Sequence, residues 1–169
     1  MPTRSDKDPK DSRLAHVPGV VPADLLEGDD EEDTTLLRNM LEDARTYILS
    51  HSWCNSITGA YFGGGVGGVF AIFLFNITSS GPEIDSWIWI VVGDVPPAYL
   101  PLEDCQTPKE AFATYIDGMT RWTRLARRGE SGTTENDIPP IDMPATPHSA
   151  ETLKNKLQLL NELVKHQFE

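Results

Sequence analysis

The chain of 169 residues is long enough for one domain with a substantial core and too short for two. Its 26 acidic and 14 basic residues give a formal net charge of -12, which argues against a general affinity for DNA, RNA or anionic membranes and favours a basic protein partner. The two cysteines, Cys54 and Cys105, are too few for a disulfide framework. Residues 1–13 also lack the apolar segment of a secretory signal, so we expect a cytoplasmic protein.

Residues 1–32 are polar, mixed in charge and interrupted by four prolines. Such a segment cannot bury enough apolar surface to offset its ordering entropy, so we predict a disordered or loosely docked arm. A single α+β domain is predicted to follow over residues 33–169. The acidic residues 29–33 lie where a helix dipole favours carboxylates. They do not form a calcium loop, because Thr34 and Met40 occupy the positions of the EF-hand glycine and glutamate.

Three segments have the apolar spacing of amphipathic helices. The first covers about residues 34–50, and its predicted core residues are Leu37, Met40, Leu41, Ala44 and Ile48. The second begins at Thr107-Pro108-Lys109-Glu110, which combines an N-cap, a proline at the first helical position and a capping-box glutamate, and it ends near residue 128. The third begins after Thr146 and continues to the C-terminus.

Two long apolar stretches without Lys or Arg, residues 56–77 and 87–92, lie between the first two helices. We predict three strands in them, at residues 56–62, 69–78 and 87–92. The predicted fold is therefore α+β, with an N-terminal helix, a three-stranded antiparallel sheet and two C-terminal helices packing on the sheet. Because the last two strands are apolar on both faces, both faces need cover from helices or from a partner. Trp87 and Trp89 share one face, so we expect them at an interface. A second copy of the chain is one possible partner there, which would make a homodimer.

A membrane span is the alternative for residues 59–77, which approach the ~20 uncharged residues that cross a bilayer. Its glycines would weaken a helix, and no Lys or Arg flanks the stretch, since the nearest are Arg45 and Lys109. A strand, a turn and a second strand explain the same residues better. We therefore predict no membrane association.

A glycine-rich segment, residues 63–68, satisfies the template of a phosphate-binding loop with Gly63, Gly65 and Gly68. The dinucleotide-binding version requires a following helix, and the kinase version requires a lysine in the next strand, and neither is present. We interpret the segment as a wide, bulged hairpin that uses glycine for positive φ. Nucleotide or phosphate binding through residues 63–68 remains an alternative function.

Residues 93–101 contain three prolines, which exclude a central strand and make a stiff connection. A stiff loop that carries acidic and aromatic side chains is suited to binding a protein, because ordering it on binding costs little. The candidate binding residues are therefore those of this loop and the turn after it, with the two tryptophans of the preceding strand: Asp94, Pro96, Pro97, Tyr99, Glu103, Asp104, Trp87 and Trp89.

A cysteine-dependent enzyme is a further alternative, with Cys54 or Cys105 as nucleophile and with His51 and Asp94 as its partners. Proximity in sequence is not catalytic geometry, however, and a histidine at a helix C-terminus followed by a buried aromatic residue and a buried thiol explains the same pattern. No cofactor and no metal site is predicted, because the histidines have no ligand spacing with either cysteine.

Residues 89–100, WIVVGDVPPAYL, and residues 107–129, TPKEAFATYIDGMTRWTRLARRG, precede a final helix capped by Thr-Pro. These segments resemble small acidic bacterial proteins without an assigned activity, over roughly residues 55–165. The resemblance implies no activity, so it transfers no functional residue. From the residues themselves we expect a non-catalytic protein-protein interaction domain, such as an immunity protein or an adaptor, that binds a basic partner.

Overall fold

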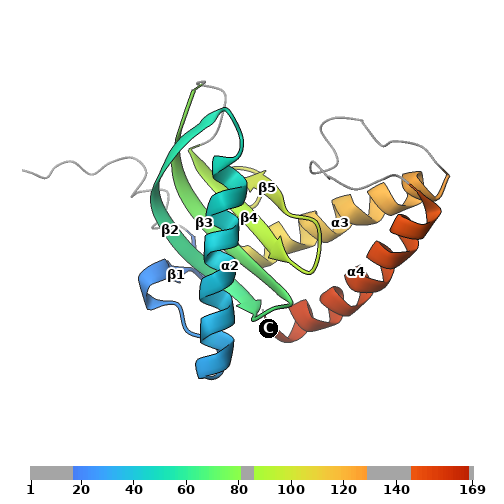
Figure 1. Ribbon diagram of the computed structural model, residues 1–169, viewed down its shortest axis with the longest axis horizontal. Coiled ribbons are helices and arrows are strands. Elements are labelled where there is room, and N and C mark those ends of the chain that lie inside the picture. The colour runs from blue at the N-terminus through green and yellow to red at the C-terminus, as the bar shows by residue number, and fades with distance from the viewer. Residues whose placement is uncertain (1–16, 81–85, 129–145, 168–169) are drawn as a thin grey trace, which may run out of the picture.

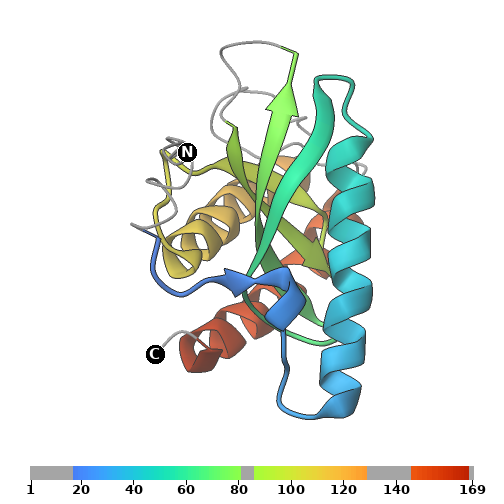
Figure 2. The same cartoon turned by 90° about the vertical axis from the view of Figure 1, so that its left-hand side faces the viewer.

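A computed structural model describes residues 17–80, 86–128 and 146–167 of the chain. This part forms a five-stranded antiparallel sheet with one α-helix on one face and two on the other (Figures 1 and 2). The elements in chain order are β1 (Val21–Pro22), the 3-10 helix η2 (Ala23–Leu25), α2 (Glu31–Leu49), β2 (Cys54–Val66), β3 (Phe70–Ser79), β4 (Trp87–Gly93), β5 (Ala98–Pro101), α3 (Pro108–Arg127) and α4 (Pro147–Gln167).

The predicted α+β class is confirmed, but the predicted number of three strands is wrong. Each strand pairs with the next one along the chain in the order β1-β2-β3-β4-β5. The strands β2 to β5 form an antiparallel meander, whereas α2 lies between β1 and β2 in the chain. The two missed strands, β1 and β5, are short and lie at the edges of the sheet. The prolines of residues 93–101 do exclude a central strand, but an edge strand tolerates proline because only one of its sides is hydrogen-bonded.

β2 is longer than predicted and strongly curved (Figure 1). Its register with β3 shifts three times, at Asn55, Thr58 and Gly63. Each shift is a bulge that bends the strand and increases its twist. The hairpin at residues 63–68 is therefore bulged as predicted, but its turn is tight rather than wide. The turn covers residues 67–69, and Gly68 adopts the left-handed φ of 80°.

α2 covers one face of the sheet, as Figure 2 shows. The five residues predicted for its core stripe are its buried residues. They pack against side chains of β3 and β4 that point to this face: Ala71, Phe73, Phe75, Ile77, Ile88, Ile90 and Val92. The helix begins at Glu31, earlier than predicted, because the Asp30 side chain caps it by accepting a hydrogen bond of 2.8 Å from the Asp33 N–H.

α3 covers the opposite face, and α4 packs chiefly against α3. The predicted N-cap of α3 is confirmed, since Thr107 Oγ1 accepts a hydrogen bond from the Glu110 N–H. Both faces of the sheet are thus covered within one chain. The apolar side chains of β3 and β4 that suggested a homodimer are buried within the described part of the chain, and the homodimer itself stays a prediction.

The described part of the predicted arm, residues 17–32, packs on the domain, and its last two residues belong to α2. Val17, Ala23 and Leu26 are buried, and β1 extends the sheet beside β2. Residues 1–16 of the predicted arm lie outside the described residues. No helix within the described ranges is long and apolar enough to cross a membrane, and residues 59–77 form the strands predicted there.

Candidate functional site

The segment from the last residue of β4 to the start of β5, residues 93–97, is the candidate site, and we call it the proline loop. Its first residue must be glycine, because a Cβ on Gly93 would lie 2.3 Å from the Val69 carbonyl oxygen and its φ is 143°. The next residue is hydrogen-bonded to the same carbonyl, since the Asp94 N–H donates to Val69 O at 2.9 Å. The start of the loop is thereby fixed to the turn between β2 and β3.

The middle of the proline loop is held by a hydrogen bond from α3. The Tyr115 hydroxyl donates a hydrogen bond of 2.6 Å to the Pro96 carbonyl oxygen. Burial raises the pKa of Tyr115 well above its usual value, so the hydroxyl keeps the proton that it donates. Val95 is buried in the core, and the rings of Pro96 and Pro97 fix their own φ angles. The proline loop is therefore rigid before any partner binds.

A hollow of about 290 Å³ lies between the proline loop and α4. Val95 and Leu153 are buried beneath it, and a salt bridge lies at its edge, where Lys156 Nζ is 3.1 Å from Asp94 Oδ1. Ligand pockets have volumes of ~300–1,000 Å³. This hollow is at the small end of that range, and it suits one inserted side chain better than a cofactor.

The structure places three of the predicted binding residues, Asp94, Pro96 and Pro97, around this hollow. Sequence reasoning missed Leu153 and Lys156, which complete its lining. Leu153 belongs to the apolar stripe of α4 and Lys156 follows it at i+3, so both lie on adjoining parts of one helix surface. No local signal connects them with a loop that precedes them by more than fifty residues.

The other predicted binding residues lie elsewhere. Trp87 and Trp89 are 1% and 0% exposed, so they belong to the core and offer no surface to a partner. Trp89 Nε1 donates to the Cys105 carbonyl oxygen at 2.7 Å, which holds the indole in place. Glu103 and Asp104 are exposed in the turn that precedes α3.

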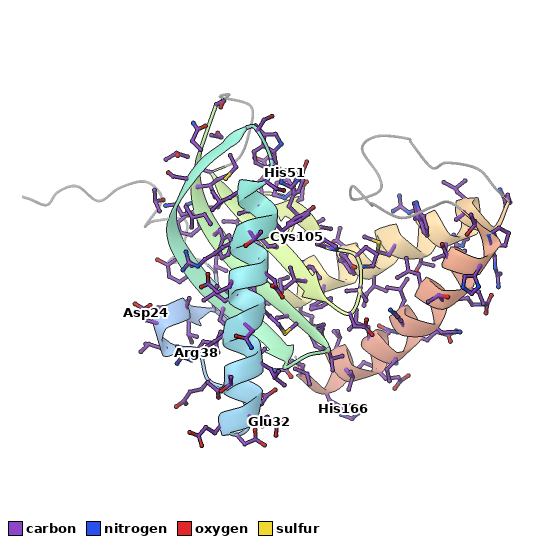
Figure 3. All side chains as sticks on the ribbon, viewed as in Figure 1. Asp24, Glu32, Arg38, His51, Cys105 and His166 are labelled. Atoms are coloured by element: carbon purple, nitrogen blue, oxygen red, sulfur yellow. The ribbon has the colours of Figure 1, made fainter. Side chains whose placement is uncertain are left out.

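Tyr99 points to the opposite face of the sheet, where it belongs to an aromatic cluster at the C-terminus of α2. The His51 ring, at the end of α2 in Figure 3, has its centroid 4.9 Å from that of Tyr47, 5.1 Å from that of Trp53 and 5.1 Å from that of Tyr99. Its Nδ1 is 3.0 Å from the Tyr47 carbonyl oxygen, as expected for a histidine that caps a helix C-terminus. Burial raises the pKa values of both tyrosines, so they stay neutral.

The residues of the cysteine-enzyme alternative do not converge. Cys54 is buried in the cluster on the α2 face, whereas Cys105 is buried in the cluster on the α3 face. Burial raises the pKa of both thiols, and the hydrogen bond of Cys105 to Thr114 offsets this only in part. Asp94 pairs with α4, on the side of the sheet opposite to His51. The arrangement therefore assembles no activated thiolate from these residues.

The glycine-rich turn already binds a carboxylate of its own chain. Asp33 Oδ1 accepts a hydrogen bond of 2.6 Å from the Gly67 N–H, and Asp33 Oδ2 accepts one of 2.8 Å from the Asp29 N–H. The Gly68 N–H is directed at Met40 Sδ at 3.3 Å. Two of the N–H groups that a phosphate would need are thus occupied by side chains of α2.

An acidic surface lies around η2 and the N-terminus of α2, where Figure 3 labels Asp24 and Glu32. Between Arg13 and Arg38 the sequence has no Lys or Arg. We call this surface the acidic end, and it consists of exposed carboxylates that make no ion pair within the described part of the chain: Asp24, Glu27, Asp29, Glu31 and Glu32.

The described residues contain no group of three or more His, Cys, Asp and Glu that could hold a metal ion. Comparison with protein-family models, with curated proteins and with solved structures finds no match to the chain. The geometry of the proline loop and the distribution of charge are therefore the grounds for a functional proposal.

Proposed function

We propose that the protein is a non-catalytic protein-protein interaction domain that binds a basic protein partner, as an immunity protein or an adaptor does. The proline loop is its binding site. One observation carries the proposal: a rigid loop presents the exposed carboxylate of Asp94 at the edge of a hollow with apolar residues beneath it. The protein is proposed to act in the cytoplasm, since both cysteines are free thiols on opposite faces of the sheet.

Rigidity supports binding at this loop. Association costs free energy for each side chain or loop that must be ordered, ~0.5–1.5 kcal/mol for a flexible side chain. The hydrogen bonds to Val69 and from Tyr115 hold the loop in one conformation before a partner arrives. The free energy of ordering this loop is then not subtracted from the affinity.

Charge supports a basic partner. The net charge of -12 and the unpaired carboxylates of the acidic end create a negative field around the domain. Such a field accelerates the encounter with a basic surface, and the effect weakens as salt is added. The acidic end therefore attracts the partner, and Asp94 makes the direct contact.

The alternatives have less support. Cysteine-dependent catalysis requires an accessible thiolate beside a base, whereas both thiols are buried and have raised pKa values. Phosphate binding at residues 63–68 requires free N–H groups, whereas the Gly67 N–H is bound to the Asp33 carboxylate. A homodimer is not part of the proposal, because the apolar sheet faces are covered.

The test is affinity capture from a cell extract with the full chain as bait, at low and at high salt. The site variant is Asp94→Asn. The matched control is Asp117→Asn, which removes the same charge from an aspartate of similar side-chain exposure, 64% against 70%, that is also in an ion pair but lies outside the hollow. We expect a basic protein that the wild type and the control retain at low salt and that the site variant loses. A partner that all three proteins retain equally would place the binding site elsewhere, and the lack of any salt-sensitive partner would refute the proposal.

A further inference from the structure

We infer that an arginine of the partner displaces Lys156 from its salt bridge with Asp94. The bound segment carries an apolar side chain next to this arginine. This inference rests on the proposed function and specifies the chemistry of the partner at the same site.

The backbone of the proline loop offers few groups for recognition. Pro96 and Pro97 have no N–H, and the Asp94 N–H is already bonded to the Val69 carbonyl. The Pro96 carbonyl already accepts the Tyr115 hydroxyl. Backbone pairing with a partner strand would lack these groups, so we base the recognition of the partner on its side chains.

The salt bridge marks the position of a cation. Lys156 Nζ donates its hydrogen bond to Oδ1 of Asp94, and Oδ2 makes no hydrogen bond to any described residue. The side chain of Asp94 is 70% exposed and that of Lys156 is 40% exposed. An exposed ion pair with one hydrogen bond contributes little stability, so displacing Lys156 costs little free energy.

An arginine can donate two parallel hydrogen bonds to the two carboxylate oxygens, whereas the ammonium of Lys156 makes one. A guanidinium is also more weakly hydrated than an ammonium, so it loses less on leaving water. An incoming arginine is therefore the cation that displaces Lys156 most readily from Asp94.

The hollow determines what accompanies the arginine. Its lining combines Val95 and Leu153 with the rings of Pro96 and Pro97, and its charged groups are Asp94 and Lys156 at the edge. A volume of about 290 Å³ accommodates one inserted side chain. Because the surface beneath Asp94 is apolar, a residue that neighbours the arginine gains by burying an apolar side chain there.

The experiment uses a phage-displayed library of random peptides, selected on the full chain. Selected peptides are then measured by fluorescence anisotropy, together with copies in which arginine is replaced by lysine. The protein variants are Asp94→Asn and Lys156→Gln. The matched controls are Asp117→Asn for the first and, for the second, Lys165→Gln, which removes an ion-paired lysine from the same helix outside the hollow. Each variant must keep the wild-type melting curve.

We expect selected peptides to share an arginine next to an apolar residue. Their affinity should fall about tenfold or more with Asp94→Asn, as for the loss of hydrogen bonds to a charged group. It should rise about two- to fivefold with Lys156→Gln, because the competing ion pair is removed. The controls should bind like the wild type, and the lysine copies should bind more weakly than the arginine peptides.

Two outcomes would overturn the inferred displacement of Lys156 by an arginine. Peptides that bind Asp94→Asn as tightly as the wild type would show that the contact lies elsewhere. Peptides that bind Lys156→Gln more weakly would show that Lys156 contacts the ligand and does not compete with it. A library that yields no arginine-bearing peptide would also overturn the inferred partner chemistry. None of these outcomes decides the proposed function, which the affinity capture with the whole partner tests separately.

Discussion

Replacing Tyr115 by phenylalanine removes the hydrogen bond that holds the proline loop and leaves the packing of the ring unchanged. The ring is fully buried, so phenylalanine fills the same space. The lost bond joins the hydroxyl to the Pro96 carbonyl oxygen at 2.6 Å. A hydrogen bond of this kind contributes a net ~0.5–1.5 kcal/mol. Because Pro96 is half-exposed and water can reach its surroundings, we expect a loss of about 1 kcal/mol in the free energy of unfolding.

Urea denaturation followed by the fluorescence of the four tryptophans measures this loss. With an m-value of about 1–3 kcal/mol/M, the midpoint should fall by roughly 0.3–1 M. Tyr47→Phe is the control, because Tyr47 is partly buried on the opposite face of the sheet and its hydroxyl makes no hydrogen bond to any described residue. The capture of a partner should weaken with Tyr115→Phe and not with the control. If both variants lose the same stability and bind alike, the hydroxyl does not hold the loop.

Two further predictions concern stability. Asp33→Ala should cost about 2–3 kcal/mol, because it removes a charged acceptor from the Gly67 and Asp29 N–H groups. Glu31→Ala, from the same helical turn, should cost under about 1 kcal/mol by urea denaturation, and equal losses would contradict this account of the glycine turn. The second prediction is a loss of stability in alkali. Burial raises the folded pKa values above the ordinary 9.0 of the thiols and 10.0 of the phenols, so the folded state holds protons that the unfolded state releases. The urea midpoint should therefore be lower at about pH 10.5 than at about pH 8, and an unchanged midpoint would contradict the burial of these groups. The buried thiols and phenols with raised pKa values are those of Cys54, Cys105, Tyr47, Tyr99 and Tyr115.

The sequence by itself determined the helices, the three long strands and the fold class. The apolar spacing of residues 34–50 identified each core residue of α2, because a helix buries the face that its period defines. The Thr107-Pro108 start of α3 was equally clear, since an N-cap depends on neighbouring residues alone. These features are local, so a local pattern is enough to predict them.

Only the tertiary structure decided which faces meet and where the candidate site lies. Periodicity shows that both faces of β3 and β4 are apolar, but it does not show whether helices of the same chain or a partner cover them. The short strand β5 has little local signal, because its hydrogen bonds come from β4 and its prolines resemble those of a loop. The hollow needs Asp94 and Lys156, and the glycine turn needs Asp33, and in each case the partners are far apart in sequence. Such contacts depend on the packing of whole elements against each other, which no short stretch of sequence records.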